Sequence, residues 1–210
     1  MPEPELYLAS VSPRRRELLE QIGVRFHVIT GLHVDEALQA GETPDEYVLR
    51  LACEKARAGR QVVQDERRGE APVLGADTCI ELDGRILGKP AGKQDAVAML
   101  KALSDRSHHV LTAICLLQGR DVYPALSRST VTFGPLGERE IEAYWQSGEP
   151  ADKAGAYAIQ GYAARFITRL EGSYSGVVGL PLFELSQLLK DIGWKFEVVG
   201  AMTHREISGL

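Results

Sequence analysis

VLGADTCIELDGRIL, residues 73–87, predicts two strands joined by a tight turn. Asp83-Gly84 separates the apolar runs 73–82 and 85–87, and an Asp-Gly pair is a strong signal for a two-residue hairpin because both central residues need positive φ. On either side of this hairpin, short apolar strands alternate with helical patterns, which is typical of crossover units. The sequence therefore predicts an α/β fold with a mixed sheet.

The other elements follow from hydrophobic periodicity and from helix end signals. Ser12-Pro13 and Gly23 bound a first helix, and the capping box that begins at Thr43-Pro44 opens a second helix that we expect to end near Ala58. Further helices are expected at 95–103, 138–145 and 181–192. Strands are expected at 6–9, 24–30, 110–117, 127–133, 164–170 and 194–199, and the polar stretch 61–70 is expected at the surface.

Composition limits the class of protein. The 210 residues are 44% hydrophobic, enough to bury a core, and 24 Lys+Arg against 29 Asp+Glu give a net charge of −5. The acidic balance argues against a broad nucleic-acid surface. No apolar run approaches the roughly 18–20 residues of a membrane span, the first residues do not resemble a secretory signal, and the three cysteines form no metal or disulfide pattern. We expect a cytoplasmic protein that binds neither nucleic acid nor membrane.

Three consecutive arginines, 14–16, fall in the first turn of the first expected helix. A helix N-terminus is already positive, so cations there go against the helix dipole. Together with the free backbone N–H groups they would attract an anion, and the guanidinium fork matches phosphate oxygens. The alternative is a solvated basic face paired with Glu17 and Glu20. Phosphate binding is favoured, with Arg16 the most surface-like of the three.

Asp77, Lys55 and Lys89 are further exceptions to local rules. A carboxylate within an apolar strand is costly unless it is paired, protonated or bound to a metal, although Asp77 alone could equally bond to a neighbouring turn. Lys55 falls within the apolar stripe of the second helix, so it either extends to solvent or points into a cleft. Lys89 follows the hairpin closely and is a second candidate cation.

The segment DKAGAYAIQG, residues 152–161, combines small residues with an amide. Gln160 can donate and accept hydrogen bonds at once, which suits the edge of a base. The histidines and cysteines show no metal or nucleophile pattern: His108 and His109 should point to opposite faces of a strand, and the cysteines should lie in the core. The exceptions together indicate a bound polyphosphate with a carboxylate-held metal, for which hydrolysis is the natural chemistry.

Six segments, in this order, resemble the Maf (septum-formation-inhibitor-like) family of nucleoside triphosphate pyrophosphatases: LYLASVSPRRRELL (6–19), EKA (54–56), LGADT (74–78), LGKP (87–90), DKAGAYAIQG (152–161) and GSYSGVVGLPL (172–182). The resemblance implies a single domain over 1–210, with two lobes around a central cleft as in inosine triphosphate pyrophosphatases, and a homodimer. It also implies cleavage between the α and β phosphates, which gives a nucleoside monophosphate and pyrophosphate, with Mg²⁺ or Mn²⁺ as divalent cofactor.

The resemblance also assigns roles to residues. It implies that Asp77 is the proton acceptor and that Asp77 and Glu36 hold the metal, with the division of Asp77 between the two roles left open. Substrate choice is linked to Arg14, Thr78 and Gln160. Phosphate contacts are implied for Ser10, Arg15, Lys55 and Lys89. One departure is Val11, where a small residue is more familiar, and we expect its effect on phosphate binding to be small.

The substrate class and its alternatives follow from the same segments. The forms at 157–161 and 172–182 resemble the branch that acts on dTTP and UTP rather than the branch associated with 7-methyl-GTP, and modified pyrimidine nucleotides belong to the same expectation. A different hypothesis is a nucleotide-binding regulator of cell division with little or no catalysis, which would bind without turnover. A nucleic-acid-binding protein built on Arg14–Arg16 is disfavoured by the net charge of −5.

Overall fold

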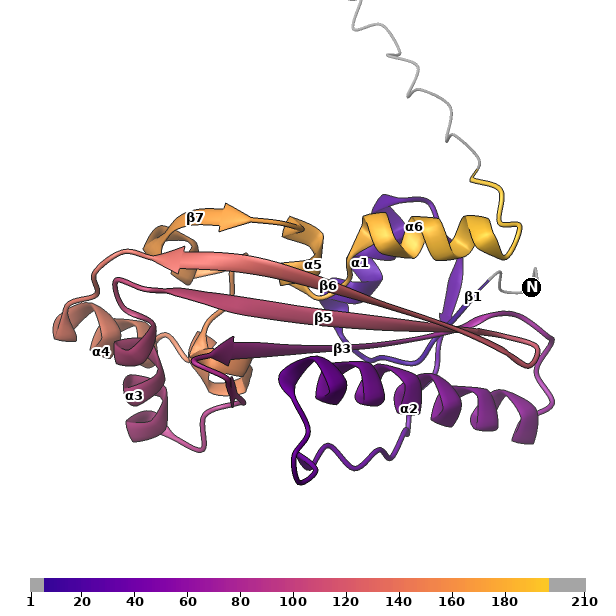
Figure 1. Ribbon diagram of the computed structural model, residues 1–210, viewed down its shortest axis with the longest axis horizontal. Helices are drawn as coiled ribbons and strands as arrows, with labels where there is room; N and C mark the ends of the chain where they lie inside the picture. The colour runs from indigo at the N-terminus through magenta and orange to yellow at the C-terminus, as the bar shows by residue number, and fades with distance from the viewer. Residues whose placement is uncertain (1–5, 197–210) are drawn as a thin grey trace, which may run out of the picture.

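A computed structural model describes residues 6–196, and in that range the chain builds one seven-stranded mixed sheet (Figure 1). In spatial order the strands are β2 (Phe26–Val28), β1 (Leu6–Leu8), β3 (Val73–Leu82), β5 (Ser107–Gln118), β6 (Asp121–Phe133) and β7 (Ile167–Glu171). β2, β1 and β3 run parallel, and the pairs from β3 to β7 are antiparallel. The expected α/β fold with a mixed sheet is therefore confirmed.

The expected hairpin joins β3 to β4 (Arg85–Leu87), and its turn has positive φ at both central residues, 52° at Asp83 and 76° at Gly84. The helices are α1 (Pro13–Gln21), α2 (Pro44–Asp65), α3 (Lys93–Leu103), α4 (Glu138–Gln146), α5 (Tyr174–Val178) and α6 (Leu182–Asp191). Three short 3-10 turns, Glu149–Asp152, Ala154–Ala156 and Tyr162–Phe166, lie between α4 and β7. The capping box of α2 is confirmed, because Thr43 and Glu46 exchange side-chain and backbone hydrogen bonds.

The sheet is covered on both faces, and the two-residue period of its strands decides which residue packs where. Leu111, Ala113 and Cys115 of β5 pack with α2, whereas Ile114 and Leu116 pack on the opposite face with α1 and α6. A third apolar cluster gathers α3 and α4 at the other end of the long strands (Figure 1). β3, β5 and β6 therefore connect two packed ends, and the middle of β3 lies between them.

Gly75 allows α2 to lie directly on β3. A Cβ atom at this position would be 2.2 Å from the carbonyl oxygen of Ala52 and 2.5 Å from the amide nitrogen of Ala56. No side chain fits in that space, so the helix backbone approaches the strand as closely as the glycine permits. This close approach fixes the distance between α2, which carries Lys55, and β3, which carries Asp77.

Several predicted boundaries are wrong. α2 continues to Asp65 rather than ending near Ala58, because Val63 extends its buried stripe, although most residues of 61–70 are exposed as expected. β6 begins at Asp121, since its first half pairs with β5 across a turn at Gly119. β2 is shorter than 24–30, and 164–166 belongs to a 3-10 turn rather than to β7. No strand forms at 194–196, and 197–199 lies outside the described residues.

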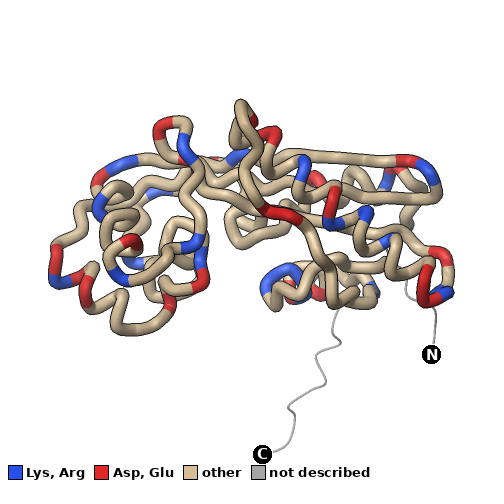
Figure 2. Tube along the Cα trace, turned by 90° about the horizontal axis from the view of Figure 1, so that it is seen from below, with Lys and Arg blue, Asp and Glu red and all other residues tan. Residues whose placement is uncertain are grey.

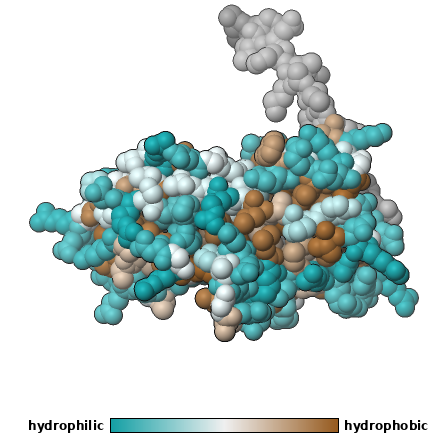
Figure 3. Space-filling view, viewed as in Figure 1, coloured by the Kyte–Doolittle hydropathy of each residue, from teal (hydrophilic) through white to brown (hydrophobic). Residues whose placement is uncertain are grey.

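The surface mixes charges of both signs. Figure 2 shows acidic and basic residues interspersed along the chain. The face in Figure 3 is hydrophilic over most of its area and is interrupted by smaller apolar areas. Among the helices that the structure describes, none is long and apolar enough to cross a membrane.

Candidate active site

A cleft of about 640 Å³ brings together segments that are far apart in the sequence. Its walls come from the start of α1, the segment before α2, α2 itself, the middle of β3, the turn after β4, the 3-10 region that follows α4, and the end of α5. All predicted site residues except Gln160 line it: Ser10, Arg14, Arg15, Glu36, Lys55, Asp77, Thr78 and Lys89. The family-like segments thus converge on one cavity, although no two of them are neighbours along the chain.

Asp77, Lys55 and Glu36 form the centre of the cleft. The Lys55 ammonium lies 2.7 Å from Asp77 Oδ1 and 2.6 Å from Glu36 Oε1, so it points into the cleft rather than to solvent. Asp77 is only 8% exposed. Burial raises the pKa of the Asp77 carboxyl above its ordinary value, and the attraction of Lys55 acts in the opposite direction. The hydrogen bond from Lys55 lowers the pKa of Glu36.

Arg15 is oriented by three acceptors. Its Nε donates to the Gly179 carbonyl at 2.8 Å, Nη1 donates to Ser10 Oγ at 3.1 Å, and Nη2 donates to Thr78 Oγ1 at 3.3 Å. Burial lowers the pKa of the Arg15 guanidinium, and the nearby Asp77 carboxylate opposes this. Arginine nevertheless keeps its charge in proteins, so Arg15 places a fixed cation beside Asp77. A cation held in this way is suited to a phosphate oxygen.

The remaining predicted residues lie nearer to the rim. Arg14 is partly exposed and lines the cleft, Lys89 is exposed at its edge, and Arg16 is exposed and does not line it. Gln160 is exposed and stands outside the wall, although the preceding Tyr157, Ala158 and Ile159 line it. The reason is a turn in which the Gly161 amide donates to the Ala158 carbonyl and directs Gln160 outward. Val11 is 66% exposed and lines the cleft beside Ser10.

Sequence reasoning missed Thr112 and Tyr47. The buried Thr112 hydroxyl lies behind Thr78, 3.0 Å from its Oγ1, and donates to the Gly176 carbonyl at 2.7 Å. Tyr47 lines the cleft, and burial raises the pKa of its hydroxyl to about 12. Two signals in the sequence were available. Thr112 is the lone hydroxyl in the apolar strand 110–117, and Tyr47 is an aromatic residue beside Lys55 on the helical wheel.

His108, His109 and the three cysteines lie where the sequence predicts. His108 is buried with its Nε2 2.7 Å from the Tyr157 hydroxyl, whereas His109 lies 2.7 Å from Glu81 on the other face of β5. The two imidazoles therefore cannot share a metal. Cys79 and Cys115 are buried and Cys53 is half-buried, all three within one apolar cluster.

Asp77 and Glu36 fit the demands of a divalent cation. Each of the two places one carboxylate oxygen against the Lys55 ammonium, so the two carboxylates lie close to each other in the cleft, and carboxylate oxygen is the ligand that Mg²⁺ and Mn²⁺ prefer. Within residues 6–196, no group of three or more His, Cys, Asp or Glu side chains is placed to hold a metal. An all-protein cage is therefore not available there, and phosphate oxygens of a substrate would complete the coordination, as is usual for Mg²⁺.

Comparison with known proteins agrees with this geometry. The model of the Maf-like protein family matches residues 5–192. A dTTP/UTP pyrophosphatase of Alkalilimnicola ehrlichii is 54% identical over 189 residues, which cover 90% of this chain and 93% of that protein. One of Cupriavidus pinatubonensis is 50% identical over 196 residues, 91% of this chain and 98% of that protein.

A distant likeness to a solved structure also exists. A HAM1 protein from Coxiella burnetii matches with a TM-score of 0.46 and 19% identity, over 90% of this chain and 99% of that one, which is too remote to bear on fold or function. The family model and the relatives that share half of their residues with this chain are enough to assign the family. The resemblance seen in the sequence is confirmed: the chain belongs to the Maf-like protein family.

Proposed function

We propose that this chain is a nucleoside triphosphate pyrophosphatase that hydrolyses dTTP and UTP to the nucleoside monophosphate and pyrophosphate. The relatives with 54% and 50% identity are named dTTP/UTP pyrophosphatases. The observation that carries the proposal is the cleft, which combines a buried carboxylate with a lysine and an arginine fixed beside it. Cations of this kind offset the charge of a triphosphate, and a carboxylate can accept the proton of an attacking water.

Asp77 acts as the proton acceptor in this proposal. Among its described contacts only Oδ1 is engaged, by Lys55, which leaves Oδ2 for a water proton. Burial raises the pKa of the carboxyl and with it the affinity for that proton, whereas the attraction of Lys55 acts in the opposite direction and favours the ionised form. A divalent cation held by Asp77 and Glu36 would supply further neutralisation of the phosphate charge. Lys55, Arg15 and Lys89 do the same from the protein side, with Ser10 and Arg14 at the phosphate-facing edge.

Selection of the pyrimidine is proposed for Thr78 on β3, inside the cleft, and for Arg14 and Gln160 near its rim. Modified pyrimidine nucleotides fall within the same substrate class. Gln160 now faces solvent beside Ala158 and Ile159 of the cleft wall.

The same proposal includes a single domain over 1–210 whose two lobes enclose the cleft, a homodimer, no nucleic-acid partner and a cytoplasmic location, where nucleoside triphosphates are made and consumed. The alternative is a nucleotide-binding regulator of cell division without turnover. The Lys55–Asp77 pair favours catalysis, because a binding protein has no need to bury a carboxylate beside an anionic ligand.

Asp77→Asn tests the proposal. The amide removes the proton acceptor at nearly constant shape, so kcat for dTTP should fall about a hundredfold or more. Asp83→Asn in the exposed turn after β3 is the matched control and should leave kcat unchanged. Thermal unfolding of both variants would show that they fold. Binding of dTTP by the wild type with no release of product would instead favour the regulator.

A further inference from the structure

The segment between β2 and α2 carries Glu36 into the cleft without regular secondary structure. Residues 29–39 form neither helix nor strand, and Glu36 itself is exposed. Its carboxylate nevertheless lies 2.6 Å from the Lys55 ammonium. Ordering a segment of this length costs much conformational entropy, more than the single Glu36–Lys55 ion pair would repay. Other contacts must therefore fix the backbone around Glu36.

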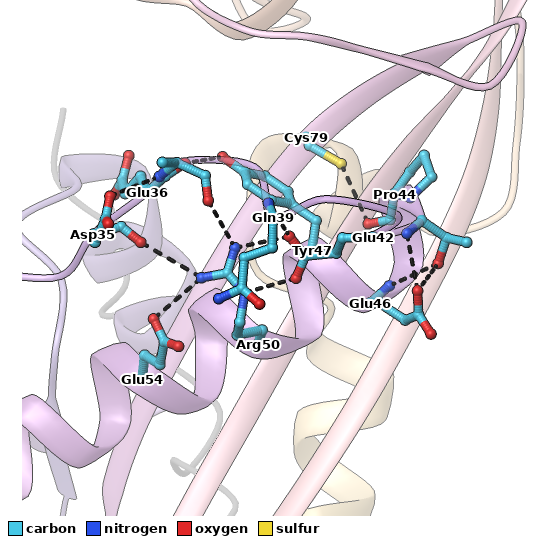
Figure 4. Close-up of polar contacts among 12 residues, drawn as sticks. Asp35, Glu36, Gln39, Glu42, Pro44, Glu46, Tyr47, Arg50, Glu54 and Cys79 are labelled. Atoms are coloured by element: carbon cyan, nitrogen blue, oxygen red, sulfur yellow. Dashed lines mark hydrogen bonds and ion pairs between the residues drawn. The ribbon is translucent and has the colours of Figure 1, made fainter.

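Arg50 of α2 supplies most of these contacts (Figure 4). Its Nη2 donates to the Ala37 carbonyl at 3.0 Å and its Nη1 to the Asp35 carbonyl at 3.5 Å, one residue on each side of Glu36. The same guanidinium grips Glu42 with two bonds, Nε to Oε1 at 2.6 Å and Nη2 to Oε2 at 2.9 Å. One planar group thus ties both the middle and the end of the segment to α2.

Tyr47 completes the arrangement one helical turn earlier. Its hydroxyl donates to the Glu36 carbonyl at 3.0 Å, and the Arg50 guanidinium lies over its ring at 5.6 Å (Figure 4). Three consecutive carbonyls, those of 35, 36 and 37, are therefore held by two side chains of α2. Lys55, which forms the ion pair with the Glu36 carboxylate, lies on the same helix.

We propose that Arg50 is a positioning residue for the reaction: it holds the backbone on both sides of Glu36 so that the Glu36 carboxylate meets the Lys55 ammonium, which also binds Asp77. The Arg50 side chain is only 17% exposed, and Glu54 holds its other edge at 3.3 Å, so the fork is fixed before substrate arrives. A lysine would keep the charge but could not reach five acceptors with one ammonium. The expected loss of activity rests on the proposed function of the cleft. The ordering of the backbone around Glu36 rests on the contacts alone.

The test compares Arg50→Lys with Arg106→Lys, a matched control whose arginine also grips one carboxylate with two bonds, at Asp83 and away from the cleft. We expect kcat/KM for dTTP to fall about tenfold in Arg50→Lys and to stay at the wild-type value in Arg106→Lys. A loss of this size is the lower end of the effect seen when a residue that orients a metal ligand is replaced. Adding Arg50→Lys to Glu36→Gln should cause no further loss, because Arg50 acts through Glu36.

Amide hydrogen exchange of 35–42 is measured on the same proteins without nucleotide. It should accelerate in Arg50→Lys and stay unchanged in Glu36→Gln and Arg106→Lys. Wild-type exchange in Arg50→Lys would overturn the proposal, and so would losses from Arg50→Lys and Glu36→Gln that multiply. If the wild type hydrolyses no nucleotide, the proposed function fails, and the exchange result alone supports or overturns the positioning role.

Discussion

Thr112 links the strand interior to the phosphate-facing edge of the cleft. Its one hydroxyl proton goes to the Gly176 carbonyl, so Thr78 must donate to Thr112, and Thr78 is then free to accept from Arg15. The result is a directed chain of hydrogen bonds from Arg15 to α5. The Gly179 carbonyl, just past α5, holds the other side of the same guanidinium.

Thr112→Val should break this chain while keeping the shape of the side chain. It leaves the Thr78 hydroxyl and the Gly176 carbonyl without a buried partner, which costs about 1–3 kcal/mol of unfolding free energy. With Arg15 less well oriented, the KM for dTTP should rise. Thr112→Ser keeps the hydroxyl and should restore KM. Equal KM values in the valine and wild-type proteins, measured with the melting temperatures, would contradict the role of Thr112.

Single residues that violate local rules could be identified from the sequence, whereas residues that obey them could not. Asp77 and Lys55 stood out because a carboxylate and an ammonium on apolar faces need a reason, and the structure places them 2.7 Å apart. Thr112 and Arg50 did not stand out, because threonine is common in strands and arginine on helices. Their partners lie far along the chain, which no local pattern reveals.

At the scale of elements, the seating of α2 on β3 sets the distance between Lys55 and Asp77. Gly75→Ala would place a methyl group 2.2 Å from the Ala52 carbonyl oxygen, so helix and strand must separate. We expect a loss of about 3 kcal/mol in unfolding free energy, together with lower kcat. Gly92→Ala at the start of α3 meets nothing within 4 Å and serves as control in denaturant titrations. A Gly75→Ala protein as stable as this control would show that α2 is not held as described.

Elements with strong end signals were predictable, and elements defined by distant pairing were not. The Asp83-Gly84 turn and the capping box at Thr43 specify their own geometry, and both are found as expected. The first half of β6, 121–126, contains Pro124 and exposed residues, so it lacks the pattern of a buried strand. It is a strand because β5 pairs with it along its whole length.

The whole molecule carries a pH dependence in one buried histidine. Burial lowers the pKa of His108 from 6.5 to about 4, with a smaller contribution from His109. As the pH falls through 6.5 the unfolded chain takes up a proton that the folded chain refuses until about pH 4. The free energy of unfolding is therefore unaffected by the titration of His108 above pH 6.5. It falls by about 3 kcal/mol in all as the pH drops from 6.5 to 4.

His108→Gln should flatten the fall in unfolding free energy between pH 7 and pH 4, since the amide does not titrate and can still bond to the Tyr157 hydroxyl. Urea titrations across this range measure the effect. His33→Gln at an exposed site is the control and should follow the wild-type profile. Parallel profiles for His108→Gln and the wild type would show that His108 does not titrate as its burial demands.

The central claim is that one cleft, assembled from both ends of the sheet, cleaves a pyrimidine nucleoside triphosphate between its α and β phosphates. The most direct measurement is turnover of dTTP and UTP beside the purine triphosphates, with Mg²⁺ or Mn²⁺, resolving monophosphate plus pyrophosphate from diphosphate plus phosphate. We predict dTMP and UMP, each with one equivalent of pyrophosphate, and slower turnover of the purines. Release of dTDP and phosphate, or no pyrophosphate from any triphosphate, would contradict the account.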